Sequence, residues 1–320
     1  MDRIRRTGQT LHVAFVAHGA LPIPPERWGA TERVIWNLHR DSSRQGFESV
    51  VINTADHDQI RLQLAQCQPD IVHLHAEAHL APCLDYARSH GMPLVLTSHT
   101  AWRHHADQPL PEHLAEPALA CDYLIALSPS LKLAFERRGC RHVHYIPNGV
   151  DTTVFRPLPK RPRTVLAVGR NSKRKKLPEI ARFFLDWPDY HLTICGPGAD
   201  EPPRPELAIP RAPNITILGN QSEAEIAQLT GESEYFVHLC EVEACALVVR
   251  EAMACGCKVW TVPYNAQGLK NVALSWESAR SDADLGRRAA REAAQLLHWP
   301  AIVGQHANFY RAILARSAAA

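Results

Sequence analysis

Short runs of apolar residues alternate along most of the chain with longer stretches in which apolar residues recur at helical spacing. In the first half of the chain, the apolar runs predict β-strands at 12–17, 48–53, 71–75, 93–99, 123–128 and 142–148. Helical stretches lie between the strands, and one of them ends at His90-Gly91, a common helix stop that Pro93 follows. This regular alternation predicts parallel β-α-β units with right-handed crossovers.

The same alternation starts again after a proline-rich and basic segment at 157–163, which we expect to be an exposed connector. Beyond it, apolar runs predict strands at 164–169, 191–196, 214–219, 235–240 and 258–263. The proline-rich segment 197–213 is expected to be an irregular surface loop, and a helical pattern begins at Ile302. The chain is therefore predicted to be an α/β protein with two Rossmann-like, doubly wound domains, 1–156 and 157–300, facing a central cleft. Ligands of such sheets bind beyond the carboxyl ends of the strands.

The composition is that of an ordinary globular protein, and it excludes several classes. Of the 320 residues, 46% are hydrophobic and 21% charged, and a formal net charge of +2 argues against an extended nucleic-acid surface. No apolar run approaches the ~20 residues that cross a bilayer, and the basic first residues are expected to lead into the first strand instead of forming a signal peptide. Nine cysteines without a CxxC pair are typical of reduced, buried thiols, so we expect a cytoplasmic protein.

Two glutamates eight residues apart form the strongest chemical signal. Glu243 follows a predicted strand, and Glu251 lies in a helical stretch from about 245 to 255 that Gly256 ends. Eight residues at ~100° each place the two carboxylates within ~80° of each other around the helix axis. They could bind separate hydroxyl groups of one ligand, while the helix N-terminus offers free N–H groups to a diphosphate. The alternative is an ordinary helix with two solvated glutamates.

A dense group of cationic residues follows the predicted strand that ends at Gly169. The loop runs from Arg170 to Lys176 and opens at the carboxyl edge of the sheet. Arginine can bond two phosphate oxygens at once and lysine supplies a compact charge, so the loop could stabilise the charge on a departing nucleoside diphosphate. The alternative is a solvated basic loop or a membrane-surface patch.

The order of these motifs resembles the retaining glycosyltransferases of family 4, which have the GT-B fold. The resemblance rests on the strand–Gly-Arg-x4-Lys loop and on the later Glu-x7-Glu-Ala-Met-Ala-x-Gly segment. Further matches are TERVIWNL at 31–38, DIVHLH at 70–75, IPNGVDTTVFRP at 146–157 and CGPG at 195–198. The ordered set covers nearly the whole chain.

The resemblance implies an enzyme that moves a sugar from a UDP-, GDP- or dTDP-sugar to an acceptor hydroxyl with retention of the anomeric configuration. It implies no metal ion or other cofactor, because cationic side chains and helix N–H groups stabilise the leaving group. By the same resemblance, Arg170 and Lys175 bind the diphosphate, Glu251 binds the ribose, and Glu243 and His99 face the sugar. Other positions that match the donor site of the family are Gly29, Ala30, Gly169, Gly196, Gly198, Ala244, Cys245, Ala246 and Leu247. The C-terminal helix, 301–320, is expected to pack back on the first domain.

Some residues depart from the family pattern. The family usually has Gly-Gly where this chain has Gly29-Ala30, and Glu-Gly-Phe-Gly where it has Glu243-Ala-Cys-Ala246; Lys258 replaces a usual proline. Alanine does not readily take the conformations with φ > 0 that glycine allows, so these changes could weaken phosphate binding. Two alternatives therefore stay open: a sugar-nucleotide epimerase on the same fold, and a catalytically weakened protein that binds a nucleotide-sugar and assists a partner.

Histidines and one basic helix offer further candidates. His73 and His75 share a face of one strand, which suits core packing, an acceptor-side role or a metal site, but no third ligand at suitable spacing completes such a site. His104-His105 could contact the acceptor, and His99 could be structural or lie at the cleft. The amphipathic basic stretch 131–142 predicts an ordinary surface helix or a weak peripheral contact with anionic lipid headgroups.

Overall fold

The computed structural model describes residues 10–26, 29–100, 110–202, 204–240 and 242–317. These residues form two compact units, each built around one parallel β-sheet. The first unit contains the described residues up to His99, those from Leu110 to Pro147 and the C-terminal helix from Trp299. The second contains Thr100 and the described residues of 148–298. The candidate acceptor residues His104 and His105 lie outside the described residues.

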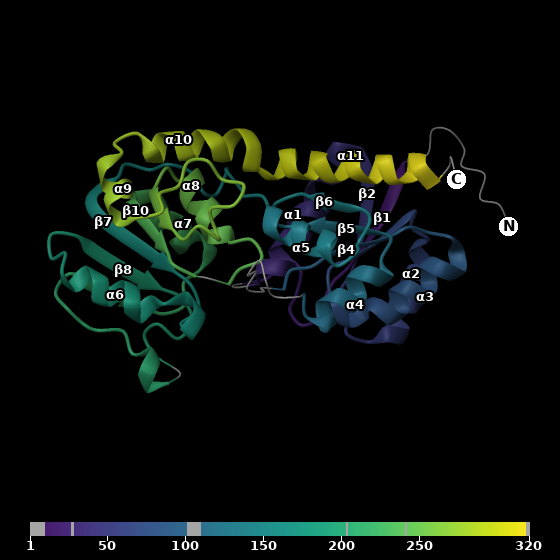
Figure 1. Cartoon of the computed structure of the whole chain (residues 1–320), viewed down its shortest axis with the longest axis horizontal. Helices are drawn as coiled ribbons and strands as arrows, with labels where there is room; N and C mark the ends of the chain where they lie inside the picture. The colour runs from purple at the N-terminus through teal and green to yellow at the C-terminus, as the bar shows by residue number, and fades with distance from the viewer. Residues whose placement is uncertain (1–9, 27–28, 101–109, 203, 241, 318–320) are drawn as a thin grey trace. The chain divides into compact units, whose positions relative to one another are not determined.

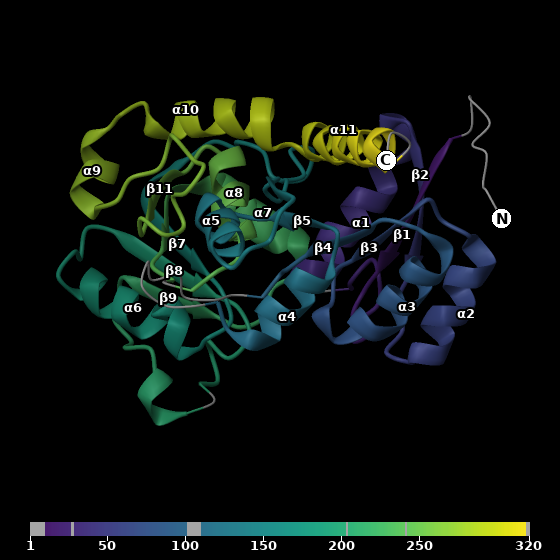
Figure 2. The ribbon, with the colours of Figure 1, turned by 45° about the vertical axis from the view of Figure 1, so that its right-hand side comes forward.

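The first sheet has six parallel strands in the order β2-β1-β3-β4-β5-β6. They are β1 (Leu11–Val16), β2 (Phe47–Ile52), β3 (Ile71–Leu74), β4 (Leu94–Thr97), β5 (Tyr123–Ala126) and β6 (Val143–Tyr145). The helices are α1 (Ala30–Asp41), α2 (His57–Cys67), α3 (Leu80–His90), α4 (Glu112–Ala120), α5 (Pro129–Arg137) and α11 (Trp299–Ser317), with short 3₁₀ turns η1 (Ser43–Gln45) and η2 (Glu77–His79). Helices α1 and α11 lie together on one face of this sheet, and α2 and α3 lie together on the other (Figure 1 and Figure 2).

The second sheet has five parallel strands in the order β11-β10-β7-β8-β9. They are β7 (Arg161–Val168), β8 (His191–Cys195), β9 (Ile215–Leu218), β10 (Ser233–His238) and β11 (Lys258–Thr261). The helices are α6 (Leu177–Leu185), α7 (Glu223–Glu232), α8 (Leu247–Ala254), α9 (Trp276–Ser281) and α10 (Leu285–Glu292). Short turns are η3 (Lys173–Lys175) and η4 (Pro205–Leu207), and a π-helical turn η5 (Ala293–Leu297) continues α10.

The strands of the second sheet bury side chains on both faces. Leu166 of β7 belongs to a core with Met253 of α8, whereas its neighbour Val165 belongs to a core with Phe184 of α6. Successive side chains of a strand point to opposite faces, so a strand with helices on both sides must be apolar at nearly every position. This is why the strands appear in the sequence as continuous apolar runs.

Every predicted strand is present within a few residues of its expected ends, so the α/β prediction is confirmed. The connector expected at 157–163 is partly wrong, because β7 already begins at Arg161 and pairs there with Ser233. The pairing shifts register just beyond this point, an irregularity at which a strand tolerates a proline. The segment before the connector packs with the second unit: Val150 donates its N–H to the Leu297 carbonyl at 2.8 Å.

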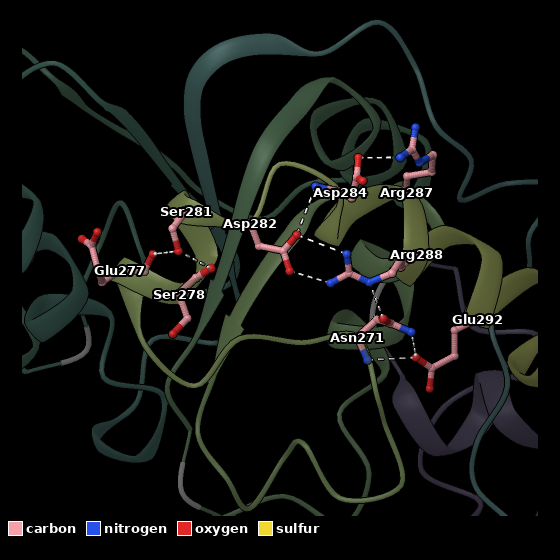
Figure 3. Close-up of polar contacts among 9 residues, drawn as sticks. All are labelled: Asn271, Glu277, Ser278, Ser281, Asp282, Asp284, Arg287, Arg288 and Glu292. Atoms are coloured by element: carbon pink, nitrogen blue, oxygen red, sulfur yellow. Dashed lines mark hydrogen bonds and ion pairs between the residues drawn. The ribbon is translucent and has the colours of Figure 1, made fainter.

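The loop that follows β11 is held by a polar network with α10 (Figure 3). The Glu292 carboxylate accepts hydrogen bonds from the backbone N–H groups of Lys270 (3.0 Å) and Asn271 (3.0 Å) and from Asn271 Nδ2 (2.8 Å). Arg288 donates from Nε to Asn271 Oδ1 (3.1 Å) and forms an ion pair with Asp282 (2.5 Å). The network therefore anchors a loop that begins at the carboxyl end of the sheet.

Candidate functional site in the second unit

The strand order of the second sheet reverses beside β7. From β7 the chain proceeds to β8 and β9 on one side and then returns to β10 and β11 on the other. The carboxyl ends of β7 and β10 are therefore neighbours, and the loops after them start at Gly169 and Leu239. Doubly wound sheets bind ligands at such a switch point.

Lys175 and Glu243 meet at this switch point. The Lys175 ammonium, from the loop after β7, forms a direct ion pair with the Glu243 carboxylate from the loop after β10. The two side chains are 13% and 14% exposed, so both charges are largely withdrawn from water. Arg174 donates to the Val242 carbonyl at 2.7 Å, and its Nη1 lies 3.6 Å from Glu243 Oε2. Two residues singled out in the sequence are thus in contact, with another cation beside them.

His238 ends β10 and completes this cluster. Its ring is buried, and its Nε2, which lies 3.6 Å from Glu243 Oε1, has no hydrogen-bond partner. Burial alone would raise the pKa of Glu243, but His238 and Lys175 together hold that pKa well below its usual range. Burial lowers the pKa of His238 itself, so its ring is neutral at neutral pH. The site therefore contains a carboxylate that stays ionised although it is mostly buried.

His238, Cys240 and Glu243 also present three kinds of ligand atom that zinc accepts, all within 4.8 Å of one another. The Glu243 carboxylate, however, already pairs with Lys175, whose ammonium places a positive charge where that of a metal ion would be. Burial raises the pKa of the Cys240 thiol, which disfavours the thiolate form that binds metals. In this arrangement the three residues fit a carboxylate balanced by lysine better than a resident metal ion.

Glycines let the loops after β7 and β8 approach closely. Gly196 has a φ of +136°, and a Cβ at this position would lie 2.3 Å from the Gly169 carbonyl oxygen. Asn171 ties the same loops together, since its N–H donates to the Pro197 carbonyl (2.8 Å) and its Nδ2 to the Gly198 carbonyl (2.9 Å). The three glycines therefore shape the loops, whether or not a donor also contacts them.

Helix α8 begins later than the sequence pattern suggests. It spans Leu247–Ala254 with Ala246 at its N-cap, so Glu243 precedes the helix and the predicted helical angle between the two glutamates is wrong. Glu251 lies within the helix and is 6% exposed. Ala246 has a φ of −65°, and Ala244 is not among the described residues with positive φ, so alanine is unstrained at both positions.

A buried cation lies at the start of α8. The Arg250 side chain is 3% exposed and donates from Nη1 to the Ala246 carbonyl at 3.2 Å. Its Nε has no hydrogen-bond partner, and the half-buried Cys245 lies close enough for the guanidinium to act on the pKa of the thiol. Burial raises the pKa of Cys245, and Arg250 opposes that rise. The N-terminus of this helix thus combines its own positive dipole with a buried guanidinium.

The candidate residues of the first unit form a separate group. Gly29 caps α1 with a φ of +152°, and its carbonyl accepts the N–H of Arg33 at 2.9 Å; Ala30, the first helical residue, is exposed. His99 follows β4, and its Nε2 lies 2.9 Å from His75 Nδ1. The pKa of His99 is lowered to about 3, mainly by burial and to a lesser extent by the charges of other histidines. The ring is therefore neutral at neutral pH.

Several residues at the second-unit site were not predicted from the sequence. His238 carried a signal, because it lies in a predicted strand whose carboxyl end faces the ligand edge of the sheet. Tyr264 lies in the loop after β11, and its pKa is raised mainly by burial and to a lesser extent by the charge of Glu243. The neighbouring Asn265 donates from Nδ2 to the Cys240 carbonyl at 2.6 Å. Nothing in the local pattern of this loop indicates that it returns to the site.

Two family models match the chain and together span most of it. Residues 5–154 match the model described as Glycosyltransferase Family 4, and residues 152–281 match the model described as Glycosyl transferases group 1. The chain belongs to the family 4-type glycosyltransferases. It is therefore a transferase, as the order of its motifs predicted. A comparison with curated protein sequences found no match.

Solved structures similar to this glycosyltransferase share its GT-B fold. Sucrose-phosphate synthase from Thermosynechococcus elongatus is 16% identical, with a TM-score of 0.74 over 96% of this chain and 100% of the other. The Anabaena protein Alr3699/HepE in complex with UDP is 16% identical, with a TM-score of 0.73 over 94% and 100%. A glycosyltransferase involved in avilamycin A biosynthesis is 18% identical, with a TM-score of 0.70 over 95% and 98%. The predicted GT-B fold is confirmed.

Among the described ranges, none of the helices combines the length and the apolar character needed to span a bilayer. In the basic helix α5, Lys132 forms an ion pair with Glu136, and just beyond its end Arg138 pairs with Glu112 at 2.5 Å. These acidic partners offset part of the cationic charge of the helix. The predicted contact with anionic lipid stays a prediction.

Proposed function

We propose that this glycosyltransferase moves a hexose-like sugar from a nucleoside-diphosphate sugar to an acceptor hydroxyl with retention of the anomeric configuration and without a metal ion. The observation that carries the proposal is the largely buried ion pair of Lys175 and Glu243 at the switch point of the second sheet. Charged groups held away from water and already in position stabilise a developing charge strongly. The proposed setting is the cytoplasmic synthesis of a glycan, lipid-linked saccharide or glycoconjugate.

In this proposal the ion pair opens when the donor binds, and Lys175 and Glu243 each contact a different part of the donor. Lys175, with the exposed Arg170, binds oxygens of the diphosphate, where negative charge grows as the sugar leaves. Glu243 accepts hydrogen bonds from sugar hydroxyls, a role that its lowered pKa supports because the carboxylate remains ionised. No protein nucleophile is required, since the departing phosphate oxygen accepts the proton of the acceptor hydroxyl. His99 is assigned to the sugar on the acceptor side.

The start of α8 supplies the rest of the proposed donor site. Its free N–H groups and the buried Arg250 create a positive potential that suits a diphosphate. Glu251, buried in the same helix, is assigned to the ribose hydroxyls. The Anabaena protein Alr3699/HepE has structures with UDP and with UDP-glucose, which makes UDP-sugars the first donors to test.

A thermal-shift panel tests the donor site. The panel contains UDP, GDP, dTDP and ADP with their common sugars, and Lys175→Ala is measured beside the wild-type protein. A ligand at ~100 times its dissociation constant adds about 2.7 kcal/mol to the free energy of unfolding, which raises the melting temperature measurably. We expect a shift for one nucleotide family that Lys175→Ala reduces. No shift with any nucleotide would refute the donor site.

Product analysis then separates the proposal from its two alternatives. An epimerase would convert the nucleotide-sugar that gives the shift in the absence of any acceptor. A weakened binding protein would give the shift but no turnover with a library of hydroxyl acceptors. Transfer with retention, read from the coupling constant of the anomeric proton in the product, supports the proposal, and an inverted product would exclude it.

A further inference from the structure

His75 and His99 form a pair on two neighbouring strands of the first sheet. His75 follows β3, His99 follows β4, and these parallel strands are adjacent. His75 Nδ1 lies 2.9 Å from His99 Nε2, and the two ring planes are inclined by 23° with their centroids 5.2 Å apart. The His75 side chain is fully buried, whereas His99 is partly exposed. One ring of the pair is therefore positioned by the protein, and the other can reach a ligand.

Both rings are neutral at neutral pH. Burial lowers the pKa of each, and the histidines around the pair act in the same direction: His18 after β1, His73 on β3 and His306 on α11. A neutral imidazole has one N–H and one bare nitrogen. The contact between the rings therefore has only two forms: either His75 Nδ1–H donates to His99 Nε2, or His99 Nε2–H donates to His75 Nδ1.

The second nitrogen of His75 distinguishes these two forms. His75 Nε2 is buried and has no hydrogen-bond partner. If His99 were the donor, the proton of His75 would lie on this nitrogen and form a buried N–H without an acceptor. If His75 is the donor, the same nitrogen is only an acceptor with an unused lone pair. Orphaned buried N–H groups are rarer in folded proteins than acceptors that are incompletely satisfied.

We propose that His75 is a positioning residue for His99, donating its Nδ1–H to His99 Nε2 so that His99 carries its own proton on Nδ1. His99 then offers a hydrogen-bond donor to an oxygen of the transferred sugar and cannot accept a proton at Nε2. The sugar contact rests on the proposed function, whereas the tautomer itself does not. The hydrogen bond also restricts the ring plane of His99, because rotation of the ring would move Nε2 away from His75 Nδ1.

His73 provides a matched control on the same strand. It is also fully buried, but both of its nitrogens are occupied: Nε2 lies 2.8 Å from Thr97 Oγ1 and Nδ1 lies 2.6 Å from Tyr310 Oη. The hydrogen-bond partners of His73 are Thr97 and Tyr310, and neither of its nitrogens bonds to His99. Replacement of His73 should therefore lower stability without changing the tautomer of His99.

The first experiment measures the tautomer of His99 in the full-length protein. Nitrogen-15 shifts and two-bond proton couplings of labelled histidines distinguish Nδ1–H from Nε2–H, and loss of a signal in His99→Gln assigns the residue. We expect Nδ1–H in the wild-type protein. An Nε2–H tautomer would overturn the proposal whether or not the protein transfers sugar.

The second experiment compares His75→Leu, His75→Asn and His73→Leu in steady-state kinetics with the donor identified by thermal shift. Loss of one positioning hydrogen bond is worth about 1.4 kcal/mol, so His75→Leu should lower kcat about tenfold with a smaller change in donor KM. Asparagine keeps an N–H donor and should restore most of the loss. His73→Leu should lose stability while keeping kcat near the wild-type value.

These outcomes distinguish a failure of the positioning role of His75 from a failure of the proposed function. Equal losses of kcat in His75→Asn and His75→Leu, or an equal loss in His73→Leu, would overturn the positioning role. Absence of turnover in the wild-type protein would instead contradict the proposed function, and the measured tautomer would still decide the inference about His75.

Discussion

The buried histidines of the first unit should make its stability depend on pH well above the range in which carboxylates titrate. His306 of α11 is 4% exposed, and burial lowers its pKa to about 4. His73 and His75 are fully buried, and their pKa values are also lowered well below the usual range. In the unfolded chain each of these groups has a pKa of about 6.5. As the pH falls, the unfolded chain therefore binds protons before the folded protein does.

The magnitude follows from His306 alone. Because its folded pKa of about 4 lies below the unfolded value, the free energy of unfolding decreases as the pH falls from 6.5 towards 4. At pH 5 the loss from this single group is about 2 kcal/mol relative to pH 7.5. His73 and His75 act in the same direction. Since a domain is stable by only about 5–15 kcal/mol, a loss of this size is measurable, and the first unit should be clearly less stable at pH 5 than at pH 7.5.

The assay is urea unfolding at pH 7.5 and pH 5, with hydrogen exchange and mass spectrometry of peptides from β3 and α11 reporting on the first unit. His306→Leu should reduce the pH dependence by about 2 kcal/mol. Ile302→Val, in the same helix, is the control: it removes a buried methyl group and should cost about 0.5–1.5 kcal/mol equally at both pH values. Equal unfolding free energies of the wild-type protein at the two pH values would refute the reasoning.

Two further predictions concern the second unit. Lys175→Met keeps the length of the side chain without its charge and should lower kcat roughly 10²–10³-fold with a smaller rise in donor KM, since the charge acts mainly in the transition state. Steady-state kinetics check this, and unchanged kcat would contradict the role of the ammonium. Gly196 has a φ of +136°, and the Cβ of Gly196→Ala would lie 2.3 Å from the Gly169 carbonyl oxygen. This substitution should lower the free energy of unfolding by about 2 kcal/mol or more. Gly91→Ala, at a φ of +61° with nothing within 4 Å of the new Cβ, should cost about 1 kcal/mol, and equal melting temperatures of the two variants would contradict the steric argument.

Most elements of the fold could be predicted because most strands bury side chains on both faces, whereas the edge strand β2 is partly exposed. A run such as HVAFVA must be apolar at successive positions, and β1 lies there, at Leu11–Val16. The sequence was less informative where the local residues do not determine whether a segment is a strand, a helix or a loop. Arg161 looks like part of an exposed connector, but pairing with Ser233 places it in β7. Helix α8 begins only at Leu247, and the residues before it lie in the loop that carries Glu243 to Lys175.

The sequence by itself therefore determined the two sets of alternating strands and helices, the approximate positions of the carboxyl ends of the strands and the family to which the chain belongs. All three follow from local patterns: burial on both faces of a strand, and motifs in a fixed order along the chain. Only the tertiary structure decided which strand ends meet, because the order of strands in a sheet is set by long-range packing. That order brings Lys175 to Glu243 and His238, and it places His75 beside His99. The protonation of these groups depends on burial and on neighbours distant in sequence, which no local pattern contains.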